Sequence, residues 1–136
     1  MKKVLLYVGF FLLGSLSLFA QDEDENEGND KIRDKMNEYI QKRLALTDAE
    51  AKKFSPIFLE YFKEWRQTLQ TYRGPDKKLE RQQKVVELRL KYRTQFQGVI
   101  GERKGSRVFD FHDRFIMEMR QLQRNRPQNN RPLRRG

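Results

Sequence analysis

Apolar residues recur along the chain at the three- and four-residue steps typical of α-helices. A first helix is predicted over about 31–45, with apolar positions at Ile32, Met36, Tyr39 or Ile40, and Leu44. A second starts near residue 48, and its face is largely aromatic: Phe54, Phe58, Tyr61, Trp65, Leu69 and Tyr72, thickened by Ile57 and Phe62.

Two further helices are predicted to follow. The third runs to about residue 100, with a stripe made of Val85, Leu88, Tyr92, Phe96 and Val99, and with Val86 and Leu90 beside it. The fourth runs over about 103–124 and carries Val108, Phe111 or Phe109, Phe115, Met119 and Leu122. No stretch alternates apolar and polar residues as a strand would. We therefore predict an all-α fold of about four helices.

Short motifs mark where these helices begin and end. Leu46 precedes Thr47, and Thr47 with Glu50 three positions later forms a capping box, in which each side chain bonds the other residue's backbone amide. Gly74 and Pro75 are expected to end the second helix and start the third, because glycine tolerates a left-handed cap and proline suits a first helical turn. Helices two and three should therefore form a long antiparallel hairpin.

Proline inside the second helix complicates its pattern. Pro56 disfavours a helical conformation at Ser55, so we expect a kink there or a restart that Ser55 caps. Gly98 and Gly101 weaken the end of the third helix.

Residues 1–20 have the layout of a secretory signal peptide. Lys2 and Lys3 precede a mostly apolar run that reaches Phe19, and Ala20 stands at the expected cleavage position. The alternative is a retained membrane anchor, for which the run is slightly short. Both alternatives predict an exported protein, and export without cysteine fits a bacterial periplasm.

Charge is segregated along the exported part of the chain. Acidic residues give −6 between 22 and 30, and six arginines with no acid give +6 over the last seventeen residues. Both ends lack helical periodicity, so we predict a disordered acidic linker at 21–30, a helical domain at 31–124 and a disordered basic tail at 125–136. The tail either contacts anionic lipid or an acidic partner, or is simply a soluble tail.

Few side chains suit catalysis. The 136 residues include 29 Lys and Arg, 19 Asp and Glu, one His and no Cys, for a net charge of +10. Without cysteine there is no thiolate chemistry, and a lone histidine excludes a two-His zinc site within one chain. Asp110 and Asp113 flank His112, and we expect surface ion pairs with Arg107 and Arg114. We predict no enzyme activity, no metal site and no cofactor.

The segment that opens at Leu46 resembles a known family. Leu-Thr-x-x-Gln or Glu at the start of a long helix, in an exported, basic, cysteine-free chain, is similar to the Spy/CpxP-like periplasmic stress proteins. Residues 51–61 and 106–115 resemble its Bacteroidetes branch, labelled sensor of ECF-type sigma factor. The resemblance covers about 31–123 and implies a curved helical dimer that binds unfolded clients or damps an envelope-stress signal without ATP. This chain has Glu50 where the original motif has Gln, and it lacks the ligands that a metal sensor would need.

These observations predict an exported, non-enzymatic stress adaptor or ATP-independent holdase that binds unfolded or envelope proteins. The alternative is a signalling partner of an inner-membrane anti-sigma or sensor protein. Basic composition alone would favour nucleic acid, but export argues against that partner. Because an elongated helical hairpin leaves apolar surface exposed, we expect a client or a second copy to cover it, and hence a homodimer.

Candidate binding residues combine cations of the third helix with aromatic residues of the second. The segment 73–101 carries a net charge of +5, which would attract acidic clients at long range. The alternative interpretation of these cations is a solvated helix face. The candidates are Phe62, Trp65, Tyr72, Lys77, Arg81, Lys84, Arg89 and Arg93.

Overall fold

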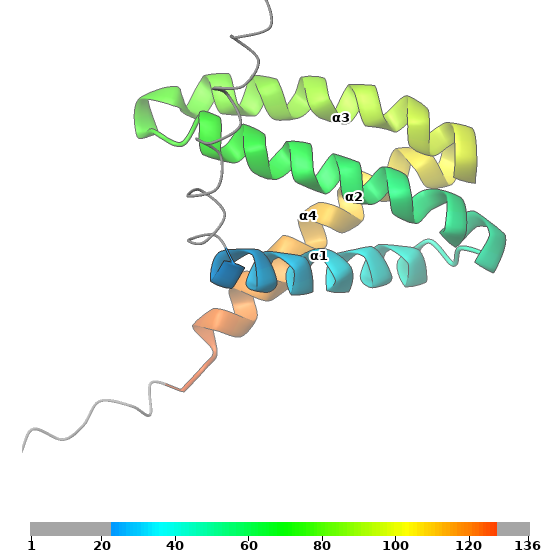
Figure 1. Cartoon of the computed structure of the whole chain (residues 1–136), viewed down its shortest axis with the longest axis horizontal. Coiled ribbons are helices and arrows are strands. Elements are labelled where there is room, and N and C mark those ends of the chain that lie inside the picture. Colours follow the sequence, from blue (N-terminus) through cyan, green and yellow to red (C-terminus); the bar gives the residue numbers. More distant parts are fainter. Residues whose placement is uncertain (1–22, 128–136) are drawn as a thin grey trace, which may run out of the picture. The chain divides into compact units, whose positions relative to one another are not determined.

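The computed structural model describes residues 23–127, and this part of the chain is helical without any strand (Figure 1). Its elements are α1 (Glu23–Arg43), α2 (Asp48–Thr71), the short 3-10 helix η1 (Pro75–Lys77), α3 (Lys78–Ile100) and α4 (Glu102–Arg124). The predicted all-α class with four helices is confirmed. The predicted signal peptide, and all of the predicted basic tail after Pro127, lie outside the described residues.

The first helix begins at Glu23, where the sequence predicted an acidic disordered linker. The structure therefore differs from that prediction over Glu23–Asp30. Carboxylates near a helix N-terminus interact favourably with the helix dipole, and Asp30 pairs with Arg33 at 3.1 Å, one turn further along. The chain divides into two units after Asp34, and the packing described below belongs to the unit that starts at Lys35.

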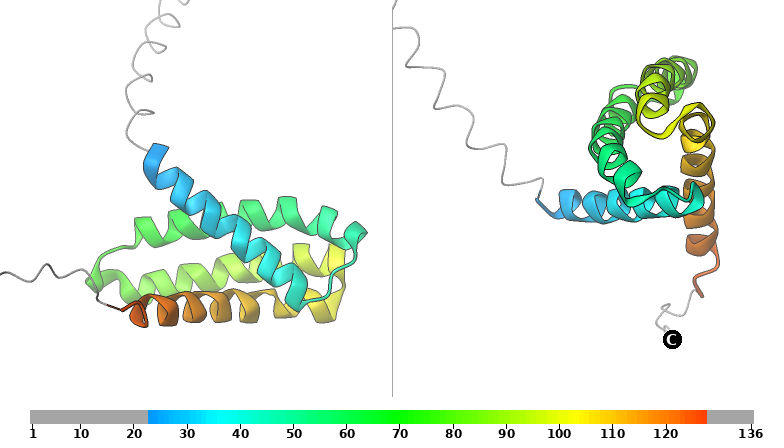
Figure 2. Two further views of the ribbon diagram at one scale, coloured as in Figure 1. Left: turned by 90° about the horizontal axis from the view of Figure 1, so that it is seen from below. Right: turned by 90° about the vertical axis from the view of Figure 1, so that its right-hand side faces the viewer.

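Helices α2 and α3 lie side by side and antiparallel, as the short connection predicted (Figures 1 and 2). The capping box of α2 is present: the Thr47 hydroxyl accepts from the Glu50 amide at 3.2 Å, and the Glu50 carboxylate accepts from the Thr47 amide at 3.2 Å. Gly74 and Pro75 separate the two helices as predicted, but the left-handed conformation expected of Gly74 is wrong, because its φ is −64° and its backbone is extended. The following Pro75 favours that extended conformation and starts η1, which precedes α3.

Pro56 lies within α2, and the predicted helix restart at Ser55 does not occur. The proline is exposed, so the carbonyl that loses its intrahelical partner lies on the solvent side of the helix. The Ser55 hydroxyl accepts hydrogen bonds from two α1 amides, Asn37 Nδ2 at 3.2 Å and Gln41 Nε2 at 2.9 Å. Ser55 therefore joins α2 to the second half of α1.

Aromatic rings fill the space between α2, α3 and α4. The ring of Tyr61 lies 5.5 Å from that of Tyr92 and 5.4 Å from that of Phe109, and the rings of Phe54 and Phe96 are 5.1 Å apart. The second half of α1 contributes the buried residues Met36, Ile40 and Leu44. Most of the apolar positions predicted for these helices thus form one core, but the predicted positions Ile32 and Leu122 are exposed.

The turn from α3 into α4 sets how these two helices pack. Gly101 lies between α3 and α4 and has a φ of +87°, which residues other than glycine rarely adopt. One turn later, Gly105 is buried against α3: a Cβ there would lie 2.5 Å from the backbone nitrogen of Gln97. The helices touch at this point, and α4 then diverges from α3 towards its C-terminus (Figure 1).

A methyl group at Gly105 should force the two helices apart. We expect Gly105→Ala to lower the free energy of unfolding by about 1–3 kcal/mol, the usual cost of overpacking. The matched control is Gly98→Ala at an exposed position of α3, where a Cβ would meet nothing within 4 Å. There we expect the free energy of unfolding to rise by about 0.5–1 kcal/mol, because alanine has the higher helix propensity. Urea unfolding followed by circular dichroism measures both, and equal effects would contradict the close approach.

Candidate binding site

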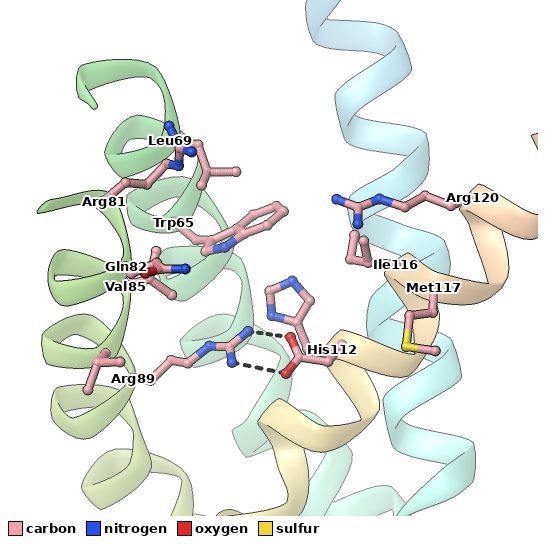
Figure 3. A pocket seen from close by; sticks show the side chains of 12 residues that line it. Trp65, Leu69, Arg81, Gln82, Val85, Arg89, His112, Ile116, Met117 and Arg120 are labelled. Carbon is pink, nitrogen blue, oxygen red and sulfur yellow. Dashed lines mark hydrogen bonds and ion pairs between the residues drawn. The ribbon is translucent and has the colours of Figure 1, made fainter. Parts of the chain in front are cut away.

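A groove of about 620 Å³ opens where α4 diverges from the α2–α3 hairpin (Figure 3). Its walls are largely apolar and are made by Trp65, Leu69, Val85, Val86, Ile116 and Met117. Val86 is 56% exposed and Met117 is 58% exposed, so two large apolar side chains in this groove face solvent. Pockets of about 300–1,000 Å³ commonly hold ligands, so this groove is large enough for one.

His112 lies at the inner side of the groove and is fully buried. Its Nδ1 is 2.7 Å from the hydroxyl of Tyr61, and its ring meets Trp65 edge-on with centroids 4.6 Å apart. Its Nε2 has no hydrogen-bond partner among the described residues. Figure 3 shows the imidazole standing between Trp65 and Ile116, with one nitrogen directed into the space between them.

Burial keeps both members of this pair uncharged at neutral pH. Desolvation lowers the pKa of His112 to about 4, and the positive charge of Arg89 acts in the same direction. Desolvation also raises the pKa of Tyr61 to about 12, against the opposing effect of Arg89. A neutral imidazole with so low a pKa is a weak proton acceptor at pH 7. The pair therefore offers polar atoms for binding rather than a strong general base.

An ion pair bridges α3 and α4 beside His112. The Arg89 guanidinium donates to both Asp113 oxygens, at 2.6 and 3.2 Å. The predicted pairing of Asp113 with Arg107 or Arg114 is therefore wrong. Those two guanidinium groups, at the i−4 and i+3 positions of α4, instead lie over the ring of Phe111, at 5.0 and 5.6 Å from its centroid.

The structure brings together three of the eight predicted binding residues. Trp65, Arg81 and Arg89 all line the groove. Arg81 also donates to the carbonyl of Tyr72 at 2.7 Å, which orients its side chain at the end of the hairpin. The combination of helix-three cations with a helix-two aromatic is therefore present, but with fewer members than the sequence suggested.

The other five predicted residues lie elsewhere. Phe62 is only 5% exposed and belongs to the core, which corrects its assignment to partner binding. Tyr72 and Lys84 line a separate, more polar depression of about 640 Å³ between α2 and α3, where Lys84 pairs with Glu87 at 3.2 Å. Lys77 and Arg93 are exposed and line neither cavity.

Sequence reasoning missed the contribution of α4. His112, Ile116 and Arg120 follow one another at four-residue steps and share one side of that helix, and Asp113 and Met117 lie beside them. This spacing was visible in the sequence, but nothing there showed that the helix diverges from α3. The same divergence exposes Val86, which the sequence placed beside the core stripe.

Comparison with known proteins adds no relatives: no protein-family model, curated protein or solved structure matches this chain. The resemblance to the Spy/CpxP-like family therefore stays a prediction.

Between residues 23 and 127, no three His, Asp or Glu side chains are grouped so that they could hold a metal ion. None of the helices in this range is both long enough and apolar enough to span a bilayer.

The buried histidine should make stability depend on pH. Because the pKa of His112 is lowered from 6.5 to about 4 on folding, the unfolded chain binds the proton more readily between these values. The free energy of unfolding should therefore be highest above about pH 6.5 and should fall as the pH drops towards 4. We expect a loss of about 2 kcal/mol between pH 7 and pH 5, measured by urea unfolding. His112→Gln should remove most of this slope, and an unchanged slope would show that other groups cause it.

Proposed function

We propose that this protein is an exported, non-enzymatic binding protein that holds apolar segments of unfolded or envelope proteins without ATP. The observation that carries the proposal is the groove between α2, α3 and α4, in which Val86 and Met117 are more than half exposed. Covering such side chains removes apolar surface from water, which favours association in proportion to the area covered.

Arginines at the groove add long-range attraction. Arg81 and Arg120 both line it, and Arg120 is exposed. Charges of this kind raise the rate of encounter with acidic segments, whereas apolar contact determines how long a segment stays bound. A groove that is open and mostly apolar suits weak, reversible binding of many sequences, as an ATP-independent holdase requires.

Two features of the sequence support the setting of this activity. Residues 1–20 have the layout of a signal peptide, and the motif from Leu46 to Glu50 resembles that of periplasmic stress proteins. The runner-up is a signalling partner that docks on one inner-membrane anti-sigma or sensor protein through the same groove. The two functions differ in whether the groove accepts one partner or many.

An aggregation assay tests the proposal. The chain without residues 1–20 should slow the aggregation of an unrelated unfolded protein without ATP. Val86→Gln combined with Met117→Gln should require several-fold more protein for the same protection, because both changes lie in the groove. Light scattering by the aggregating client measures the effect.

Raising the salt concentration should weaken protection only in part, because salt screens exposed charges over about 8 Å at physiological ionic strength but leaves apolar contact intact.

The matched control changes apolar residues outside the groove. Leu90 is 49% exposed and Leu122 is 63% exposed, and neither lines it. Leu90→Gln combined with Leu122→Gln should leave protection unchanged. Equal loss in both double variants would contradict a specific groove. Protection of no unfolded client, together with tight binding of one envelope protein, would favour the signalling function.

A further inference from the structure

Two buried nitrogen atoms beside the groove lack hydrogen-bond partners. They are Nε2 of His112 and Nε of Arg89, and both residues line the groove. Buried polar groups in proteins almost always have partners, because leaving one unpaired costs about 1–3 kcal/mol. These two atoms are therefore available to pair with a polar group of a ligand in the groove.

The surroundings assign a hydrogen atom to the Nε2 of His112. The Tyr61 hydroxyl has one hydrogen, and its hydrogen-bond partner among the described residues is Nδ1 of His112, 2.7 Å away. If Nδ1 donated instead, the buried hydroxyl hydrogen and Nε2 would both lack partners, which costs more. The hydroxyl therefore donates to Nδ1. The neutral imidazole then carries its own hydrogen on Nε2. Both unpaired atoms are therefore donors, and a ligand that pairs with them must supply an acceptor.

Charge identifies the kind of acceptor. The groove is lined by three arginines, Arg81, Arg89 and Arg120, against one carboxylate, Asp113. The lining is therefore positive even with the Arg89–Asp113 pair formed. A carboxylate accepts hydrogen bonds from both donors and carries the charge opposite to that of the lining. Hydrogen bonds to an ionised acceptor are roughly twice as strong as neutral ones.

The apolar walls identify what the carboxylate is attached to. Leu69, Val86 and Met117 flank the polar groups, so the same ligand must bring apolar side chains. Trp65 and Ile116 stand on either side of the imidazole in Figure 3. Both are only partly buried, whereas Nε2 itself has no exposed surface, so a ligand reaches Nε2 only when one of these two side chains moves aside.

We propose that the groove selects segments in which an aspartate or glutamate is flanked by apolar residues, with the carboxylate accepting from Nε2–H of His112. This inference rests on the proposed function and names the class of client sequence. The acidic side chain enters towards His112 and Arg89, the apolar neighbours cover Val86 and Met117, and Arg120 attracts the segment at the exposed side of the groove.

Peptide titration measured by tryptophan fluorescence tests the selection. Trp65 is the single tryptophan of the chain and lines the groove, so its emission reports binding there directly. The probes are a short soluble peptide with one glutamate between pairs of leucines, and its glutamine and lysine analogues. The glutamate peptide should bind about tenfold more tightly than the glutamine peptide, and the lysine peptide should bind most weakly.

Variants separate the donor from the surrounding charge. His112→Phe keeps a buried ring and should bring the glutamate-to-glutamine ratio close to one while both peptides still bind. His112→Phe also leaves the Tyr61 hydroxyl without its partner, so a second variant is needed that does not touch the core. Arg120→Gln changes an exposed residue and should reduce the glutamate-to-glutamine ratio about threefold. Arg93→Gln removes the same charge from an exposed α3 position outside the groove and should leave the ratio unchanged.

Equal affinity for the glutamate and glutamine peptides would overturn the inference while leaving the holdase function intact, since the Val86 and Met117 variants test that function separately. Loss of the ratio in Arg93→Gln as well would also overturn it, by showing that net charge alone decides. Two other occupants are tested in the same cell. Displacement of the peptide by laurate at lower concentration would identify a lipid site instead. A Trp65 signal that changes with protein concentration, with light scattering showing a dimer, would identify a second copy.

Discussion

The close approach of α3 and α4 at Gly105 is the constraint on which the groove depends. With no side chain at this position, the backbone of α4 packs directly on Gln97, and Gly101 provides the positive φ between the two helices. Helices that touch near one end and diverge leave a wedge between them. Aromatic rings, including Phe96 and Phe109, fill its narrow part, and the wide part remains open as the groove.

His112 links the filled and open parts of this wedge. On one side it shares a hydrogen bond with Tyr61, the residue at the centre of the aromatic core, and on the other it lines the groove. The same burial that lowers its pKa makes its unpaired nitrogen costly. A ligand that paired with this nitrogen would remove that cost, so occupancy of the groove would raise the free energy of unfolding.

The Arg89–Asp113 pair limits the positive charge that the groove can offer a partner. It joins α3 to α4 at 2.6 Å, and the guanidinium lies next to His112 (Figure 3). Its Asp113 partner is more than half exposed, so part of its stabilisation is screened by solvent. The positive charge that remains available to a partner comes mainly from Arg81 and Arg120, which arrive from different helices.

The sequence by itself determined the helices, because periodicity, the Thr47–Glu50 capping box and the short Gly74–Pro75 connection act over a few residues. Two predictions failed: the helix does not restart at Ser55, because α2 continues through Pro56, and Phe62 is buried rather than available to a partner. Of the candidate site, local patterns identified Trp65, Arg81 and Arg89 but not Arg120. Only the tertiary structure decided the burial of His112, the partner of Asp113 and the exposure of Val86, because each depends on the angle at which α4 leaves α3, and that angle comes from contact between residues on different helices.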